Sequence, residues 1–407
     1  MSAFNLAISP EADELRKKLT QFMDDRILPA EAVYRQQMAD LGEPHGHPQI
    51  LLDLKREARE LGLWNLFLPH KTRWTEGMTN LDYAYIAEIL GRSPIASEVC
   101  NCSAPDTGNM EILTMFGTPE QQEQWLAPLL EGEIRSAFAM TEPAVASSDA
   151  SNVECSIVED GDDYVINGRK WWISGSADPR CKILIVMGKT DPSAARHQQQ
   201  SMVLVPVDTP GVTIVRNLRV YGYVDREGHC EITFEDVRVP KANILGGPGQ
   251  GFAIAQARLG PGRIHHCMRT IGVAERALEM MCRRAEERVT FGETLASRSS
   301  VQDWIADARI RIDQARLYTL FTASLMDKEG NRTAAVQIAG IKVGIPEMAL
   351  EILDNAVQLH GGGGVGDDFG LAEMWAHTRI LSIADGPDAV HRRTIARHEL
   401  KRHRKEH

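Results

Sequence analysis

Long apolar segments, paired cysteines and an excess of basic charge are all missing from this chain of 407 residues. No stretch approaches the roughly 20 consecutive apolar residues that a membrane-spanning helix needs. The seven cysteines are scattered without CxxC spacing, which indicates neither a zinc ribbon nor a disulfide framework, and we expect free thiols in a reducing compartment. The net charge of −11 argues against a general nucleic-acid binder, although the tail from Arg392 to Lys405 is locally basic.

Targeting and metal-binding signals are also absent from the sequence. The N-terminal stretch MSAFNLAISPEADELRKKL has no basic region followed by an apolar run, and the final KEH is not a peroxisomal or retention signal. His265, His266 and Cys267 are adjacent, so on a helix they point to different faces instead of converging on one ion. We therefore expect a cytoplasmic protein with no metal site and no membrane association.

Hydrophobic periodicity divides the chain into helices, a β-region and helices again. Residues 1–131 are predicted to form an N-terminal α-helical domain, in which Pro29 ends an amphipathic helix and Thr118 begins another with a capping box. Residues 132–245 contain short β-branched runs between Gly, Pro and Asp turns, which predicts an antiparallel β-domain. Residues 246–407 are predicted to be a C-terminal α-helical bundle. The fold class is therefore α+β with three domains.

One long helix of the C-terminal region is predicted with particular clarity. Its apolar stripe consists of Ile264, Met268, Ile271, Ala274, Leu278, Met281 and Ala285. Further helices are expected through Trp304 to Leu325 and through Met348 to Leu359.

A glycine run, HGGGGVG, contains the pattern GxGxxG at Gly361, Gly363 and Gly366 and imitates an esterase HGGG signature. The run follows a helical stretch and not a strand, so it is not in the setting of a dinucleotide-binding fingerprint. Because GxSxG occurs nowhere, an α/β-hydrolase is also excluded. Two interpretations stay open: the glycines end a helix, or they let a phosphate or another chain approach closely.

Four segments contain notable polar or aromatic groups, and in one of them a Trp beside a Ser hydroxyl would suit a flat heteroaromatic ring. They are AFAMTEPAVASSD, NGRKWWISG, AEERVTFG and QLHGG. Each alone has an ordinary structural explanation, such as a turn with side-chain-to-backbone bonds or a buried Trp pair. In this order and spacing, together with the strand ending FEDVRVP, they resemble the acyl-CoA dehydrogenase family over essentially the whole chain. RLGPGRIHHCMRT, VASSDA and IADGPD are most similar to the branch of acyl-CoA dehydrogenase family members 10 and 11.

The resemblance implies a bound FAD shared between subunits, and hence a homodimer or homotetramer. It places Phe138, Met140, Thr141, Ser148, Trp172, Ser174, Arg288, Phe291, Gln358, Gly361, Gly362 and Asp388 at the cofactor, and Arg263, Ser148 and Gly386 at the substrate. Ser148 would reach the pyrophosphate and Ser174 the flavin ring near N5. Arg288, Phe291, Gln358 and the paired glycines would come from the neighbouring subunit. The implied partners are an acyl-CoA substrate and an electron-transfer flavoprotein.

The segment SIADGPDAVHRR aligns with the catalytic loop of that family. Asp385 stands where most members with a base here carry Glu, and it would remove the α-proton while the β-hydrogen leaves as hydride to flavin N5, giving a trans-2-enoyl-CoA in fatty acid β-oxidation. Asp388 is expected to cap the last helix or touch the cofactor. Pro387, Ser299 and Ala376 depart from the family's usual residues.

The shorter base raises a question of reach. Asp lacks one methylene of Glu, about 1.5 Å, and a misplacement on the order of 1 Å can cost about a hundredfold in rate. Our hypothesis is that Asp385 makes room for a branched or hydroxylated acyl chain. The alternatives are a flavin oxidase resembling nitroalkane oxidase, which also uses Asp as base, and a DNA-associated flavoprotein of the same fold.

Overall fold

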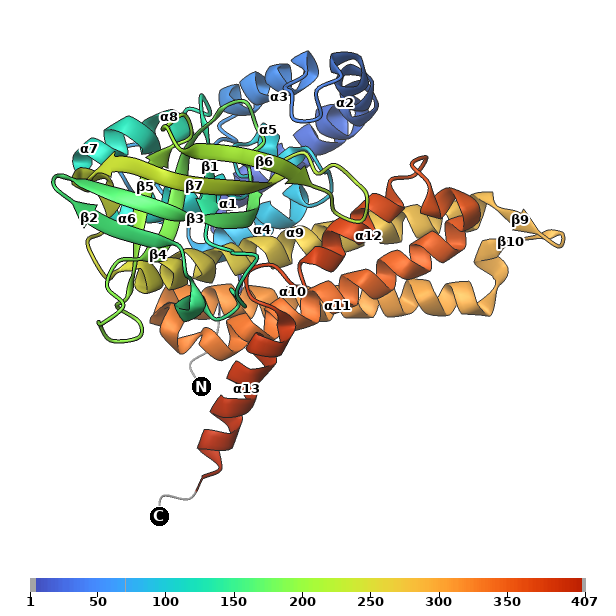
Figure 1. Ribbon diagram of the computed structural model, residues 1–407. Helices are drawn as coiled ribbons and strands as arrows, with labels where there is room; N and C mark the ends of the chain where they lie inside the picture. Colours follow the sequence, from blue (N-terminus) through green and yellow to red (C-terminus); the bar gives the residue numbers. More distant parts are fainter. Residues whose placement is uncertain (1–4, 70, 405–407) are drawn as a thin grey trace. The chain divides into compact units, whose positions relative to one another are not determined.

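The computed structural model describes residues 5–69 and 71–404; the first four residues and the final KEH, which bear on targeting, lie outside the described residues. The chain forms two compact units (Figure 1). The sheet unit consists of Ala30–Gly77 and Glu98–Gly262, and the helical unit of Met1–Pro29, Met78–Ser97 and Arg263–His407. None of the described helices is both long and apolar enough to cross a membrane.

The sheet unit is built on one sheet of eight strands in the order β6-β7-β3-β2-β4-β5-β8, with β1 alongside β4. The strands are β1 (Arg135–Ala139), β2 (Ser156–Asp160), β3 (Asp163–Ser174), β4 (Cys181–Lys189), β5 (Gln200–Pro206), β6 (Val212–Leu218), β7 (His229–Pro240) and β8 (Ile244–Leu245). Most pairs are antiparallel, as predicted. The β1–β4 pair and a short β2–β4 contact are parallel instead, which the sequence pattern did not indicate.

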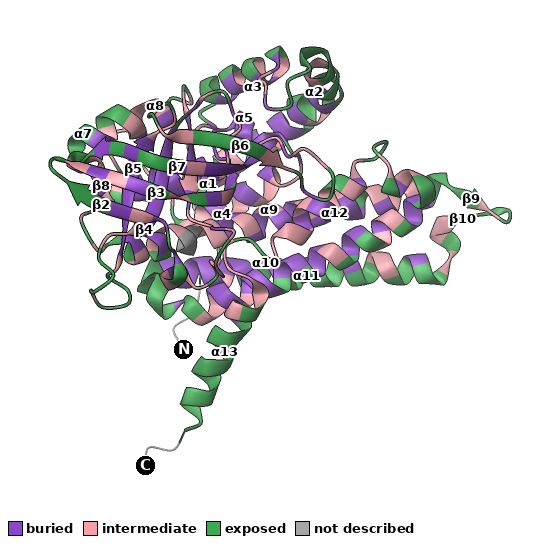
Figure 2. Ribbon diagram, in the orientation of Figure 1, coloured by how far each residue is buried: buried purple, intermediate pink, exposed green. Residues whose placement is uncertain are grey.

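Burial explains the arrangement of the strands. Strand β4 reads as a nearly continuous apolar run because both of its faces are covered, whereas β6 at the sheet edge is largely exposed (Figure 2). Ile166, Leu184 and Phe234 are among the side chains that fill the core. The helices and short turns of this unit are α3 (Gln49–Glu60), α6 (Asp106–Phe116), α7 (Pro119–Gln121), η2 (Gln122–Leu126), α8 (Ala127–Leu130), η3 (Ala150–Asn152) and η4 (Lys241–Asn243).

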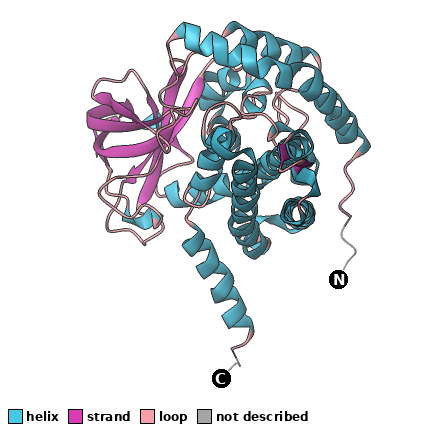
Figure 3. Cartoon of the chain, turned by 90° about the vertical axis from the view of Figure 1, so that its right-hand side faces the viewer, coloured by secondary structure: helices cyan, strands magenta, loops and turns pink. Residues whose placement is uncertain are grey.

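The helical unit contains α1 (Pro10–Phe22), α4 (Asn80–Leu90), α10 (Ser299–Thr333), α11 (Ala335–His360), α12 (Leu371–Ile380) and α13 (Asp388–Arg402). Helix α9 (Gly251–Glu287) begins in the sheet unit and continues into this one. All seven residues of its predicted apolar stripe are buried. Helix α11 packs against both α10 and α12, and Figure 3 views several helices of this unit nearly end-on. The short elements are η5 (Leu295–Ser297), η6 (Gly361–Val365) and the β9–β10 hairpin (Val289–Thr290 with Glu293–Thr294).

Two glycines allow α4 and α9 to cross in direct backbone contact. A Cβ at Gly91 would overlap the Arg269 carbonyl, and one at Gly272 would overlap the Glu88 carbonyl. Only glycine permits such an approach.

The predicted helix end at Pro29 is wrong. A π turn, η1 (Met23–Ile27), follows α1, and its last bond joins the Leu28 N–H to the Met23 carbonyl. The turn resets the hydrogen-bond ladder, so Pro29 falls in the first turn of α2 (Leu28–Leu41), where its missing N–H is tolerated. The capping box at Thr118 is confirmed.

Both C-terminal loops follow helices, as predicted. Gly361 ends α11 with φ 63°, and residues 381–387 connect α12 to α13. Helix α13 is largely exposed beyond its first turn (Figure 2). Asp388 begins α13 as its first helical residue, but no side-chain cap bond forms there, so the expected capping role is wrong. Pro387 occupies the cap position instead.

Candidate active site

The Asp385 loop is held in an unusual backbone conformation. Asp385 has φ 53°, in the left-handed region that few residues except glycine, Asn and Asp adopt. Its carbonyl oxygen accepts from Arg263 Nη2 and contacts His391 Nε2, each at 3.2 Å. Gly386 follows with φ 94°, and a Cβ there would lie 3.0 Å from His391 Nε2. Arg263, Asp385 and Gly386, predicted together from sequence, are therefore adjacent in the structure.

Buried basic groups surround this loop. Lys342 of α11 donates to the carbonyl oxygens of Leu381 and Gly386 and lies 3.9 Å from Asp388 Oδ1. Burial lowers the pKa values of Lys342 and Arg263, and it lowers the pKa of His391 to about 4. His391 is thus neutral near pH 7, and because a carbonyl only accepts, its proton lies on Nε2.

The Asp385 carboxylate itself faces a histidine of α9. His266 Nε2 lies 3.3 Å from Asp385 Oδ2. Arg269 Nη2 lies 3.3 Å from His266 Nδ1, and since a guanidinium can only donate, Nδ1 is the acceptor. The proton of a neutral His266 therefore lies on Nε2, toward the Asp385 carboxylate. His265, next along the chain, is buried against Tyr83 on another face.

A second group of predicted residues lies at the other end of α11. Arg288 follows α9, Phe291 is fully exposed at the tip of the β9–β10 hairpin, and Gln358 is exposed near Gly361 and Gly362. A Cβ at either glycine would meet nothing within 4 Å. Lys342, beside the Asp385 loop, precedes Gln358 by 16 residues, which is about 24 Å of helix. One chain therefore does not bring the two groups together.

The sheet unit presents the remaining predicted residues. A bulge in β3 gives Trp172 φ 55° and leaves 40% of its surface exposed. Ser174, at the end of β3, is half-buried. The Thr141 carbonyl accepts from the Trp171 N–H at 3.0 Å.

Phe138 and Ser148 differ in the burial and the contacts of their side chains. Phe138 is half-buried on β1, with the Arg258 guanidinium 4.4 Å above its ring. Ser148 is exposed in the loop after Thr141. Its neighbour Ser147 instead accepts from the Glu142 N–H at 2.9 Å, the local bond expected of a turn.

Lys170 fixes the loop that contains Met140 and Thr141. Its buried ammonium donates to the carbonyls of Met140 (2.9 Å) and Met187 (2.6 Å) and to Glu142 Oε1 (2.8 Å), which uses all three of its protons. Glu142 in turn accepts from the N–H groups of Glu154 and Cys155. The pair joins strands β3 and β4 to the loop after β1.

We expect Lys170→Met to destabilise the protein by about 3–5 kcal/mol, because Glu142 would be left as a buried, unpaired charge. Lys17→Met is the control, since Lys17 is exposed and its ion pairs with Asp13 and Glu14 are screened by solvent. Denaturant unfolding measures both. Equal midpoints for the two variants would contradict the role assigned to Lys170.

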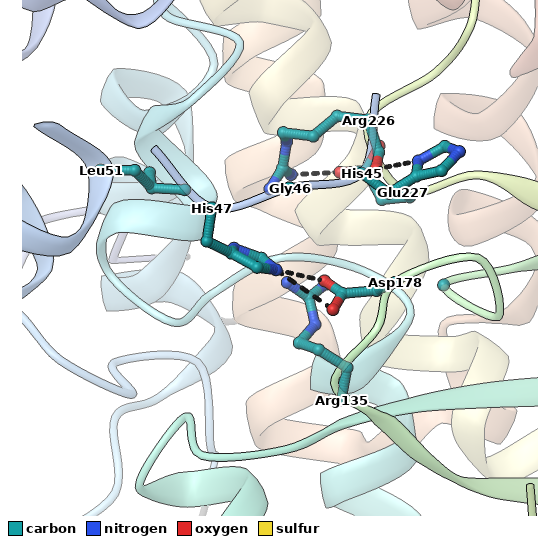
Figure 4. Close-up of a pocket in the computed structure, with 9 residues that line it drawn as sticks. His45, Gly46, His47, Leu51, Arg135, Asp178, Arg226 and Glu227 are labelled. Carbon is teal, nitrogen blue, oxygen red and sulfur yellow. Dashed lines mark hydrogen bonds and ion pairs between the residues drawn. The ribbon is translucent and has the colours of Figure 1, made fainter. Parts of the chain in front are cut away.

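A small cavity elsewhere in the sheet unit is part of a charge cluster and not a substrate pocket (Figure 4). Its volume is about 10 Å³, enough for about one water molecule. His47 Nε2 contacts both oxygens of Asp178 at 3.1 and 3.0 Å, and Arg135 and Arg226 also line the space. Such a volume cannot admit a substrate.

Sequence comparisons decide the family. The N-terminal, middle and C-terminal domains of acyl-CoA dehydrogenase match residues 9–133, 137–237 and 249–400. The chain belongs to the acyl-CoA dehydrogenase family. It is therefore an FAD-dependent oxidoreductase of the α+β fold class predicted above, and the resemblance to family members 10 and 11 is confirmed.

Relatives match nearly the whole chain. A Mycobacterium tuberculosis protein named "Probable acyl-CoA dehydrogenase FadE2" is 57% identical over 98% of this chain and 97% of its own length. Acyl-CoA dehydrogenase family member 10 from Mus musculus and family member 11 from Gallus gallus are each 53% identical, over 97% and 96% of this chain. The chain spans only 37% and 51% of those two proteins.

Solved structures agree with this assignment. Butyryl-CoA dehydrogenase from Megasphaera elsdenii matches with a TM-score of 0.81 at 26% identity, over 97% of this chain and 100% of that one. The electron transferring flavoprotein of Acidaminococcus fermentans gives a TM-score of 0.81 at 27% identity, over 98% of this chain and 100% of that chain.

Several residues of the candidate site were not found by sequence reasoning. Lys170, His229, Lys342 and His391 lie in unremarkable helix or strand positions, and His266 was considered only as a metal ligand. Each contacts a partner at least five residues away in sequence; the shorter-range contacts are those of Arg269 with His266 and of Asp225 with His229. The one sequence signal that could have identified such residues is a polar residue at an apolar position of a helical stripe. Lys342 is a residue of this kind.

Proposed function

We propose that this chain catalyses the α,β-dehydrogenation of an acyl-CoA thioester to a trans-2-enoyl-CoA, with Asp385 removing the α-proton. The observation that carries this proposal is the Asp385 loop: a carboxylate on a left-handed residue whose carbonyl contacts Arg263 and His391. Such strain, fixed by buried partners, is typical of functional sites.

The residues predicted for FAD have the surface that such a cofactor requires. Trp172 and Phe291 expose large aromatic surface that the chain itself leaves uncovered, and space is open above Gly361 and Gly362. We infer that Phe138, Met140, Thr141, Ser148, Trp172 and Ser174 would hold FAD from the sheet unit, and Arg288, Phe291, Gln358, Gly361, Gly362 and Asp388 from helical units. When bound, FAD supplies the acceptor for the β-hydrogen and its electron pair.

Asp385 takes the α-proton and its neighbours keep it in place. Arg263 and His391 hold the backbone carbonyl, which fixes the loop that presents the carboxylate to the substrate. The Nε2–H of His266 stabilises the carboxylate before the proton arrives. The shorter Asp side chain leaves room for a branched or hydroxylated acyl chain, and we propose acyl-CoAs of this class as the substrates.

We also propose that the active molecule is a homodimer or homotetramer that passes electrons to an electron-transfer flavoprotein. The separation of about 24 Å along α11 supports this assembly, since it prevents one chain from joining Arg288 and Asp385 at the same part of a cofactor.

Anaerobic titration of the purified flavoprotein with straight-chain, 2-methyl-branched and 4-hydroxy acyl-CoAs tests the proposal. We expect bleaching of the flavin absorbance, with the fastest rate for a branched or hydroxylated substrate. Best activity on simple straight chains would overturn the substrate class. Hydrogen peroxide production from a nitroalkane, without bleaching by any acyl-CoA, would favour the oxidase alternative and overturn the dehydrogenase.

A further inference from the structure

Ser174, His229 and Asp225 form a hydrogen-bonded chain within the sheet unit. Ser174 Oγ lies 2.9 Å from His229 Nδ1, and His229 Nε2 lies 3.0 Å from Asp225 Oδ2. Ser174 ends β3 and His229 begins β7, where the strand register pairs them directly. Antiparallel partners place their side chains on the same face, so the contact follows from the fold.

Surrounding groups hold the imidazole in one orientation. His229 and Asp225 are both buried, and the Trp172 ring centroid lies 5.8 Å from that of His229. The backbone N–H of His229 donates to Asn217 Oδ1 at 2.8 Å. Rotation of the imidazole would break its hydrogen bonds to Ser174 and Asp225.

Because the Asp225 carboxylate keeps a proton on Nε2, only Nδ1 of His229 can gain or lose a proton. A carboxylate can only accept, so Nε2 carries a proton whether the ring is neutral or charged. When His229 is neutral, bare Nδ1 accepts from the Ser174 hydroxyl, which then offers only lone pairs to a ligand. When His229 is charged, Nδ1 donates to Ser174, and the hydroxyl proton is free to point at a ligand.

A flavin ring requires both of these states in turn. Its N5 accepts a hydrogen bond when oxidised and donates one when reduced. We propose that His229, oriented by Asp225, sets the direction of the hydrogen bond that Ser174 makes to the flavin edge and reverses it when the flavin changes redox state. This inference rests on the proposed binding of FAD beside Trp172 and Ser174.

The charges near His229 make both protonation states accessible. Burial alone lowers the pKa of His229, but the hydrogen bond to Asp225 and the carboxyl of Glu227 outweigh it, and the pKa is raised. Glu227 is paired with Arg226, and its own pKa is raised to about 7, mainly by burial. His45 Nε2 contacts the Asn217 side chain at 2.7 Å, and His45 Nδ1 contacts the Arg226 carbonyl oxygen at 3.0 Å.

The coupling between His229 protonation and flavin reduction can be measured as the pH dependence of the flavin reduction potential. Two-electron reduction of a flavin to its anion takes up one proton, so its potential falls by about 30 mV for each tenfold decrease in proton concentration. If His229 releases its proton to solvent in the same step, the net uptake is zero. The potential is then independent of pH in the range where His229 is charged beside the oxidised ring and neutral beside the reduced one.

The experiment is a spectroelectrochemical titration of the FAD-loaded protein from about pH 5.5 to about pH 9.5, around the ordinary histidine pKa. We expect a flat region in the wild-type potential, replaced by a uniform slope of about 30 mV per pH unit in His229→Gln. Gln keeps hydrogen-bonding groups but has no titrating proton. The control is His47→Gln, which removes another histidine–carboxylate contact of the sheet unit and should keep the flat region.

Ser174→Ala tests whether the flat region of the potential comes from the direction of the Ser174 hydrogen bond or from the charge of His229 alone. In this variant His229 still titrates, but the hydroxyl is gone. We expect the uniform slope here too. A flat region that persists in Ser174→Ala, or its absence from the wild type, would overturn the inference. So would Ser174-dependent release of free CoA from an acyl-CoA, which would make the serine a nucleophile. No acyl-CoA is used in the titration, so failure of the proposed dehydrogenation is detected separately.

Discussion

Asp385→Asn is expected to retain FAD and lose its reduction by acyl-CoA by about 10²- to 10⁴-fold, the contribution of a well-placed general base. Asparagine matches aspartate in size and also tolerates left-handed φ, so the contacts of the 385 carbonyl with Arg263 and His391 should persist. The loss would then come from the carboxylate alone. Asp385→Ala would disturb the loop conformation as well and is a poorer probe.

The measurement is the rate of flavin bleaching in anaerobic stopped flow with saturating acyl-CoA. Asp303→Asn is the matched control, because Asp303 is an exposed residue of α10 far along the chain from the loop, and it should reduce at the wild-type rate. If Asp385→Asn also reduces at that rate, the base lies elsewhere. His266, 3.3 Å from the carboxylate, is then the group to replace next.

Local patterns predicted the elements whose stability is itself local. The apolar stripe of α9 repeats at the helical period, and every predicted member is buried. The capping box at Thr118 needs only residues three apart, and it forms. The predicted helix end at Pro29 was wrong because a π turn upstream shifts the hydrogen-bond ladder. No residue preference in the sequence predicts such a turn.

The candidate site was predictable only where family motifs identify residues. Asp385 and Arg263 are 122 residues apart, yet both were identified and they are in contact. The hydrogen-bonded chain of Ser174, His229 and Asp225 was not predicted. Ser174 and His229 are 55 residues apart in the sequence, and only the pairing of their strands brings them together. His229 follows an ordinary turn sequence, so its role is visible only once β3 and β7 are paired.

Glu98 is a buried carboxylate of the sheet unit that is paired with four basic side chains. Its carboxylate contacts Lys55, Arg135, Arg180 and Arg226, two of which line the cavity in Figure 4. Burial by itself raises the pKa of Glu98, but the surrounding cations hold it well below its ordinary value. The carboxylate is therefore charged at neutral pH and compensates the cations around it.

We expect Glu98→Gln to lower the free energy of unfolding by about 3–5 kcal/mol at neutral pH, because several buried cations lose their counter-ion. A depressed folded pKa stabilises the protein above the unfolded pKa, and this contribution disappears as pH falls through the folded value. The gap between wild type and Glu98→Gln should thus be full at neutral pH and narrow only in acid. Denaturant unfolding over that pH range measures it, with Glu131→Gln, the exposed partner of Arg59, as the control. A gap that is constant into strong acid would mean that the lost stability comes from packing and not from charge.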